Sequence, residues 1–274
     1  MQKKYQIRII MIIVFFSLPI FLNAKYFSSG EVYNKIIGRN EIRIGISKHY
    51  PPLNFNSGKK GVEMLIAKNL GKFLGVRVKL IPLNLKKYVS SIRNNNVDII
   101  IAGLSRNLVR AKRIWFSVPY ITITPGVLAS KRIIPETKFS EDFEAEPIKT
   151  LWDLKRLNRF KIAVKKGSSY EYLLKIKFPS MSKVYVKTND EGMMLLNNGK
   201  VHGFIHDSLY LQYLYRKSGK LRSRYKLLEG GKQNEKICIG LPFGDTVLKN
   251  QVDTFIDEII RQGLINSWLE KHNR

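Results

Sequence analysis

The segment Asn94–Gly103, NNNVDIIIAG, decides the fold, because an asparagine-rich stretch that ends a helix leads directly into a short apolar strand. Apolar runs of this kind are typical of strands buried on both faces of a parallel sheet. The segment Asn197–Asp207, NNGKVHGFIHD, repeats the pattern later in the chain. We therefore predict two units of similar build.

Strand and helix patterns alternate around these two segments. Isoleucines alternate through Glu41–Ser47, which predicts a strand, and Val62–Leu74 has apolar residues at helical spacing before the stop signal Gly75. The other predicted elements are strands at Val76–Leu80, Val97–Ala102, Phe160–Val164, Val184–Val186, Val201–Ile205 and Lys236–Leu241, and helices at Lys86–Asn94, Glu171–Ile176, a segment capped by Asp190, Ser208–Tyr215, Val247–Ile260 and a short one through Trp268.

This order is β-α-β-α-β, twice, and predicts an α/β fold of two lobes with mainly parallel sheets. The first lobe is predicted to be discontinuous, with residues 41–124 and 237–274, and the second to span 125–236. The chain crosses between them near Tyr120–Leu128 and Glu229–Lys236, which predicts a hinge of two segments. Ligands of such sheets bind beyond the carboxyl ends of the strands.

Residues 1–24 have the pattern of a secretory signal peptide, with Lys3, Lys4 and Arg8 before an apolar run and Ala24 at its end. The alternative is an uncleaved membrane anchor. In either case the rest of the chain is expected outside the cytoplasm. No cysteine follows the run, so a lipoprotein anchor is not expected.

The chain of 274 residues carries a formal net charge of +27 and one cysteine, Cys238. A disulfide framework and a cysteine-based zinc site are thereby excluded, and we predict no metal and no cofactor. The basic residues occur in scattered pairs such as Lys59-Lys60 and Lys86-Lys87 rather than in one run, so nucleic acid is not an expected partner. The charge indicates either a basic surface exposed to solvent or attraction to a partner, which would be an anionic surface or an anionic ligand.

Six motifs, in order, resemble family 3 extracellular solute-binding proteins, the periplasmic polar-amino-acid receptors of ABC importers. They are IRIGI…YPPLNF from Ile42, VDIIIAGLS from Val97 with Arg110, FSVPY from Phe116, LWDL from Leu151, AVKKGSS from Ala163 and the closing Gly263–Leu269. His206-Asp207 with Lys165 is most similar to the glutamine-binding branch. The resemblance implies a type II periplasmic binding fold, a clamp that closes on its ligand, and a permease partner.

The resemblance also implies the ligand-binding residues. Arg110 matches the arginine that binds the ligand carboxylate, with Arg106 and Arg113 as competing candidates, and a guanidinium is chemically suited to a buried carboxylate. Asp207 is expected to hold the ammonium, although its position also suits a helix N-cap. The predicted set is Tyr50, Gly103, Ser105, Arg110, Lys165, Ser168, Ser169, His206 and Asp207.

Departures from the family pattern bear on the ligand. Leu85 stands where a second aromatic ring is expected, and Ser47 replaces an acidic residue. His49, Lys165 and His206 make the side-chain end rich in donors, which favours a polar or acidic amino acid of glutamine or glutamate type over a cationic one. We expect a monomeric, non-enzymatic receptor in the periplasm of a Gram-negative envelope.

Two alternatives stay open at this point. One is a dehydratase-like enzyme acting on cyclic carboxylic acids, with His49, His206 and Asp207 as acid–base groups. The other is an envelope sensor that keeps the clamp and has lost transport.

Overall fold

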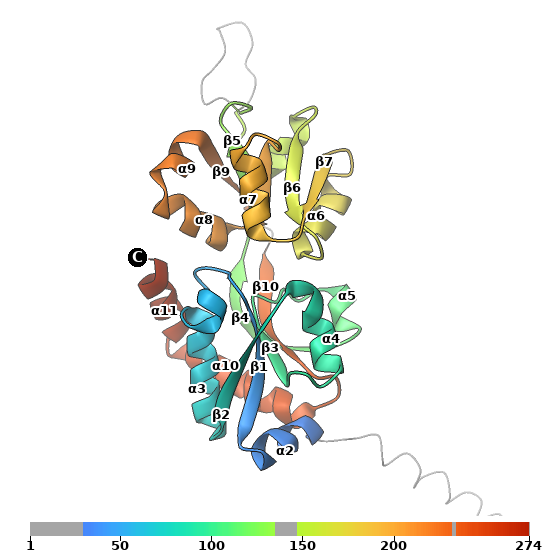
Figure 1. Cartoon of the computed structure of the whole chain (residues 1–274), viewed down its shortest axis with the longest axis vertical. Helices are drawn as coiled ribbons and strands as arrows, with labels where there is room; N and C mark the ends of the chain where they lie inside the picture. Colours follow the sequence, from blue (N-terminus) through green and yellow to red (C-terminus); the bar gives the residue numbers. More distant parts are fainter. Residues whose placement is uncertain (1–29, 135–146, 232–233, 274) are drawn as a thin grey trace, which may run out of the picture.

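The structure is a computed structural model that describes residues 30–134, 147–231 and 234–273. It has two lobes, one above the other in Figure 1, and two chain segments pass between them. The predicted signal peptide lies outside the described residues.

The lower lobe in Figure 1 contains a five-stranded sheet in the order β2-β1-β3-β10-β4. Its strands are β1 (Glu41–Ser47), β2 (Arg77–Leu83), β3 (Ile99–Ile101), β4 (Trp115–Ile123) and β10 (Glu235–Leu241). Around them lie α2 (Glu31–Gly38), η2 (Asn56–Gly58), α3 (Val62–Leu74), η3 (Leu85–Lys87), α4 (Tyr88–Arg93), α5 (Leu108–Ala111), α10 (Thr246–Arg261) and α11 (Leu264–Asn273).

The upper lobe has a second five-stranded sheet in the order β7-β6-β8-β5-β9. Its strands are β5 (Pro125–Ser130), β6 (Lys161–Lys165), β7 (Ser182–Val186), β8 (Gly203–Asp207) and β9 (Tyr225–Glu229). The helices of this lobe are η4 (Leu151–Arg156), α6 (Ser169–Lys177), α7 (Asn189–Asn197), α8 (Ser208–Lys217) and α9 (Gly219–Arg224).

The two sheets share one plan. In the first, β1 pairs in parallel with β2 and β3, and β10 is antiparallel to both of its neighbours. In the second, β6 pairs in parallel with β7 and β8, and β5 is antiparallel to both of its neighbours. Each sheet is therefore mixed, although four of its five strands point the same way. The two antiparallel strands, β5 and β10, are those that enter each lobe from the other.

Apolar residues cover both faces of each sheet, as expected for strands such as β3 that are buried on both sides. Ile99, Ile100 and Ile101 are all fully buried, and Ile100 faces a different core cluster from its two neighbours. The predicted elements are present; β1 and α3 have the predicted bounds, and other elements have shifted ends. The strand predicted at Val97–Ala102 is confined to β3, and the one predicted at Val201–Ile205 begins at Gly203.

One predicted cap is wrong. The sequence pattern predicts Asp190 as the N-cap of its helix, but the cap lies two residues earlier. Thr188 caps α7, and its hydroxyl accepts a hydrogen bond from the Glu191 N–H at 3.1 Å. Threonine and aspartate are both good N-caps, so composition alone does not separate the two positions.

The crossings are short. Strand β4 ends at Ile123 and β5 begins at Pro125, so only Thr124 separates a strand of one lobe from a strand of the other. Thr124 is tied to the start of α8, because its carbonyl accepts from the Ser208 N–H at 2.8 Å. The return crossing joins β9, ending at Glu229, to β10, beginning at Glu235. The exact lobe boundaries remain a prediction.

Candidate ligand-binding site

A cavity of about 50 Å³ lies between the lobes and is lined by residues of both. The first lobe contributes Ser47, His49, Tyr50, Leu85, Tyr88, Ala102, Gly103, Ser105 and Arg110, and the second contributes Lys165, Ser168, Ser169, Tyr170, Asn189 and His206. Eight of the nine predicted site residues are in this lining, and the exception is Asp207.

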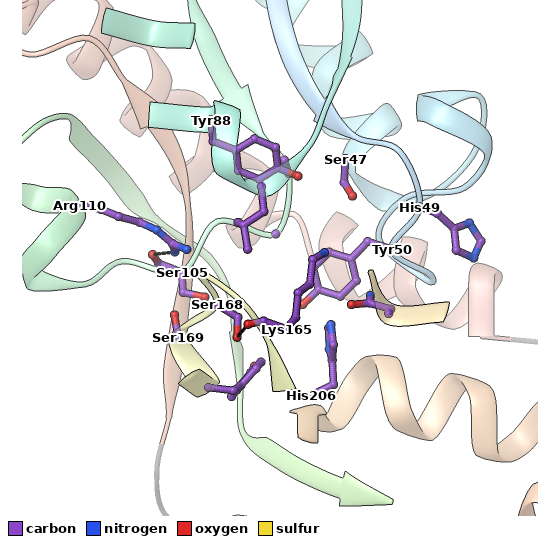
Figure 2. A pocket seen from close by; sticks show the side chains of 15 residues that line it. Ser47, His49, Tyr50, Tyr88, Ser105, Arg110, Lys165, Ser168, Ser169 and His206 are labelled. Atoms are coloured by element: carbon purple, nitrogen blue, oxygen red, sulfur yellow. Dashed lines mark hydrogen bonds between the residues drawn. The ribbon is translucent and has the colours of Figure 1, made fainter. Parts of the chain in front are cut away.

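The sheet plan explains why these residues meet. Ser47 is the last residue of β1, Lys165 is the last of β6, and Gly103 follows β3 closely. Parallel strands present their carboxyl ends at one edge of a sheet, and the two edges face each other across the hinge. Residues far apart in sequence thus come together in one cleft (Figure 2).

Arg110 lies at one end of the cavity beside Ser105, Ser168 and Ser169 (Figure 2). Its guanidinium donates to the Ser105 carbonyl at 2.8 Å and to the Gly167 carbonyl of the other lobe at 3.1 Å. Burial lowers the pKa of Arg110, and the negative charge of Glu235 partly offsets this. The competing candidates Arg106 and Arg113 are exposed and do not line the cavity.

The first turn of α6 adds donors at the same end. Ser168 caps this helix, since its hydroxyl oxygen accepts from the Glu171 N–H at 3.3 Å while the hydroxyl donates to the Lys165 carbonyl at 2.7 Å. The Ser169 hydroxyl is buried and has no hydrogen-bond partner among the described residues. A guanidinium, an unpartnered hydroxyl and a helix N-terminus together form an environment suited to an anion.

Lys165 is a second cation in the lining, and its ammonium group has no hydrogen bond or ion pair within the described ranges 30–134, 147–231 and 234–273. Burial lowers its pKa, and the more distant charge of Asp190 opposes that effect. The part of the chain that the structure describes contributes no aspartate or glutamate to the lining. The cavity is therefore cationic, with an unpaired ammonium near its middle.

Asp207 lies just outside the lining and is 0% exposed. One of its oxygens accepts from the Tyr210 N–H at 2.7 Å, which caps α8. The other accepts from the hydroxyl of Tyr50 in the opposite lobe and lies 2.5 Å from Nδ1 of His206. Burial by itself raises the pKa of Asp207, but His206 and these hydrogen bonds outweigh it and lower the pKa below its usual value.

Gly103 needs to be glycine at this site. Its φ of +58° lies in the left-handed region, and a Cβ added there would lie 1.9 Å from Cε1 of Tyr50. Its N–H donates to Glu63, a fully buried residue of α3 that also accepts from the Tyr120 hydroxyl at 2.7 Å. Burial raises the pKa of Glu63 to about 7 despite these hydrogen bonds.

Sequence reasoning missed several of these residues. Tyr88, Tyr170 and Asn189 line the cavity only because distant elements pack together, and no local pattern marks them. Glu63 was detectable, because it shares a helix face with the buried residues Ile66, Ala67 and Leu70. An acidic residue on the apolar face of a helix indicates a specific polar partner.

Two lobes with this strand order, joined by two crossings and enclosing a cavity, define a type II periplasmic binding fold. The chain belongs to the bacterial extracellular solute-binding proteins, family 3, whose profile matches residues 42–274. Within the described residues, the structure has no helix of sufficient length and apolarity to span a membrane.

Individual relatives show the range of this family. The L-cystine-binding protein TcyJ of Escherichia coli (strain K12) is 26% identical over 256 residues, which cover 91% of this chain and 89% of the relative. A cyclohexadienyl dehydratase of Pseudomonas aeruginosa is 25% identical over 103 residues, covering 36% of this chain and 38% of the relative. An amino-acid ABC transporter substrate-binding protein from Streptococcus pneumoniae bound to L-arginine has a TM-score of 0.74 and 20% identity, covering 88% of this chain and 97% of the other.

Proposed function

We propose that this protein is a periplasmic receptor that binds an amino acid in the interlobe cavity and delivers it to an ABC transporter permease. The family assignment supports binding of a small solute, and the names of relatives such as TcyJ support an amino acid. Receptors of this kind act by population shift, because a ligand that touches both lobes favours the conformation in which they meet.

The ligand that fits the charges has a polar or acidic side chain, of glutamate or glutamine type. The observation that carries this proposal is the pairing of Arg110 and Lys165 in one cavity without a carboxylate in the described lining. Arg110 would hold the α-carboxylate and Lys165 the side-chain group. A cationic ligand such as arginine would leave like charges facing one another, which is costly in a desolvated site.

The experiment is calorimetric titration of L-glutamate and L-glutamine into the wild-type protein and four variants. We expect Arg110→Ala to weaken both ligands by on the order of 2–5 kcal/mol, because a buried carboxylate loses its partner. We expect Lys165→Ala to weaken glutamate more than glutamine. Arg113→Ala and Lys166→Ala are the matched controls, since both remove exposed cations close by in sequence. Binding of neither amino acid to the wild-type protein would overturn the proposal.

The dehydratase-like alternative is favoured by one observation, the short contact of His206 in the lining with Asp207 behind it. It would act on a cyclic carboxylic acid with His206 as the acid–base group. Incubation with such acids and measurement of ultraviolet absorbance separates the two functions. A receptor leaves the spectrum unchanged.

A further inference from the structure

The interlobe cavity leaves the charge of the chain unexplained, because its lining takes only Arg110 and Lys165 of 48 lysines and arginines. A second hollow, of about 410 Å³, lies on the surface of the first lobe, where α3 ends and β2 begins. Lys68, Lys72 and Arg77 line it, and the described residues contribute no aspartate or glutamate to this lining. We call it the basic hollow.

The cations of the basic hollow have no partners in the protein. Lys68 and Lys72 are one turn apart on α3, and they and Arg77 are exposed. In the part of the chain that the structure describes, none of these three side chains forms a hydrogen bond or an ion pair, although Glu41 lies beside Arg77 in the strand register. Lys79, also exposed, follows on the same face of the edge strand β2. Like charges gathered in this way repel one another, and an anionic partner removes that cost.

Exposed apolar side chains flank these cations. Phe73 directly follows Lys72 and is 47% exposed, and Ile37 of α2 is 41% exposed, three residues before Asn40 in the lining. Cations beside exposed apolar side chains suit a membrane interface, where the cations meet lipid phosphates and the apolar groups reach the edge of the acyl chains. A small soluble anion gains nothing from the apolar groups, so the combination favours a lipid surface.

The basic hollow lies at the end of the lobe where the described chain begins. The Arg77 N–H donates to the Asn40 carbonyl at 3.2 Å, and Asn40 follows α2, the first described helix, at the bottom of Figure 1. If the apolar run Ile9–Leu22 is kept as an anchor, eight residue steps join it to Gly30, a reach of no more than about 29 Å. Such an anchor would hold this end of the lobe close to the bilayer.

We propose that the basic hollow docks reversibly on an anionic phospholipid bilayer, with Lys68, Lys72 and Arg77 at the lipid phosphates and Phe73 in the headgroup region. Docking keeps the receptor at the membrane that holds its permease. Each lysine or arginine near an anionic surface strengthens binding about fivefold, and salt screens the attraction. The inference goes beyond the proposed function and does not depend on which solute enters the interlobe cavity.

The first test is cosedimentation of the protein, as the cell exports it, with vesicles of phosphatidylglycerol and phosphatidylcholine or of phosphatidylcholine alone. We expect binding to the anionic vesicles that weakens with salt, and we expect Lys68→Gln/Lys72→Gln/Arg77→Gln to weaken it on the order of a hundredfold, three such factors. The control Lys161→Gln/Lys177→Gln/Lys200→Gln removes three exposed lysines of the other lobe, reaches the same net charge and should keep nearly the wild-type affinity. Equal weakening by both variants would overturn the proposal, because net charge alone would then explain the binding.

The second test decides also where a retained leader binds both kinds of vesicle. It compares tryptophan fluorescence of Phe73→Trp with that of Tyr185→Trp, since the two side chains are 47% and 45% exposed and lie on different lobes. Phosphatidylglycerol vesicles should shift the emission to shorter wavelength for Phe73→Trp alone, and pure phosphatidylcholine vesicles should shift neither. Any leader is the same in both variants. An unshifted emission from Phe73→Trp would overturn the proposal.

Inorganic phosphate distinguishes a bilayer from a free anion. At equal ionic strength, phosphate and chloride should release the protein from vesicles to the same extent. Stronger release by phosphate, with calorimetric binding that Lys68→Gln/Lys72→Gln/Arg77→Gln abolishes, would make the hollow a phosphate site and overturn the proposal. Amino-acid affinity of this triple variant should match wild type, because the hollow and the interlobe cavity share no residue. The membrane inference and the proposed function can therefore fail separately.

Discussion

Glu63 is the residue whose chemistry is least expected from its surroundings. It is 0% exposed, and the three described groups that lie near its carboxyl are the Gly103 N–H, the Tyr120 hydroxyl and the Asn54 amide, none of which is cationic. One carboxyl oxygen and the Asn54 amide nitrogen have no hydrogen-bond partner among the described residues. Desolvation therefore favours the protonated acid, and the pKa is about 7.

Glu63→Gln is expected to change how stability depends on pH. In the unfolded chain this carboxyl titrates near its ordinary pKa of 4.5, whereas in the folded protein it titrates at about 7. The stabilisation from the protonated group is fully present below about 4.5 and is lost as pH rises through about 7, a loss on the order of 3 kcal/mol. The glutamine variant keeps a neutral side chain at every pH, so it should exceed the wild-type protein in stability at pH 8.

Urea unfolding of both proteins at pH 5 and pH 8 measures this difference. Glu258→Gln is the control, because that glutamate is on the surface and its pKa is lowered by hydrogen bonds from Arg261 and Gln262. It should show no gain at pH 8. A Glu63→Gln protein with the same loss of stability as wild type between the two pH values would contradict the argument.

Among the helices and strands, those with a clear local sequence pattern were the ones that could be predicted. β1 and α3 end at the predicted residues because isoleucine alternation and the left-handed Gly75 are short-range signals. The β3 prediction was too long, because apolar residues beside a strand are buried whether or not they pair. The site residues that belong to sequence motifs were predicted. Tyr170 lines the cavity because the two lobes pack together, and no local sequence pattern marks it.

The N-cap of α7 gives a direct test of one such correction. The Thr188 hydroxyl accepts from the Glu191 N–H, so Thr188→Ala should lower the free energy of unfolding by about 1 kcal/mol. Thr188→Ser keeps the hydroxyl and should retain most of the wild-type stability. Thermal or urea unfolding compares them with Asp190→Ala, which removes a first-turn charge and leaves the cap in place, at a cost of roughly 0.3–1 kcal/mol. Equal stability of the alanine and serine variants would show that Thr188 is not the cap.

At the scale of the whole molecule, a few polar contacts hold the two lobes together across the cavity. The Arg110 guanidinium donates to the Gly167 carbonyl, the Tyr50 hydroxyl to Asp207, and the Tyr170 hydroxyl to Glu235 at 2.5 Å. Each contact joins a residue of one lobe to a residue of the other lobe. Because the crossings are short, such contacts bias the angle between the lobes. The Tyr170 ring also belongs to the core of its own lobe, so a test of its contact must keep the ring.

Tyr170→Phe is therefore expected to open the molecule without destabilising either lobe. A hydrogen bond to a charged group contributes about 1.5–3 kcal/mol, so its loss should shift the balance between open and closed forms roughly tenfold or more. Solution scattering should then give a larger radius of gyration without ligand and a wild-type value with saturating ligand. Affinity should fall in proportion to the smaller closed population.

Tyr172→Phe is a matched control on the same helix, because Tyr172 is 58% exposed whereas Tyr170 is 7% exposed. It removes the same atom from the same type of residue, and the Tyr172 hydroxyl makes no hydrogen bond within the described residues, so the radius of gyration and the affinity should both stay at wild-type values. If Tyr170→Phe weakened binding with an unchanged radius of gyration, the hydroxyl would act on the ligand inside the cavity and not on the angle between the lobes. The scattering measurement thus assigns Tyr170 either to closure or to direct recognition.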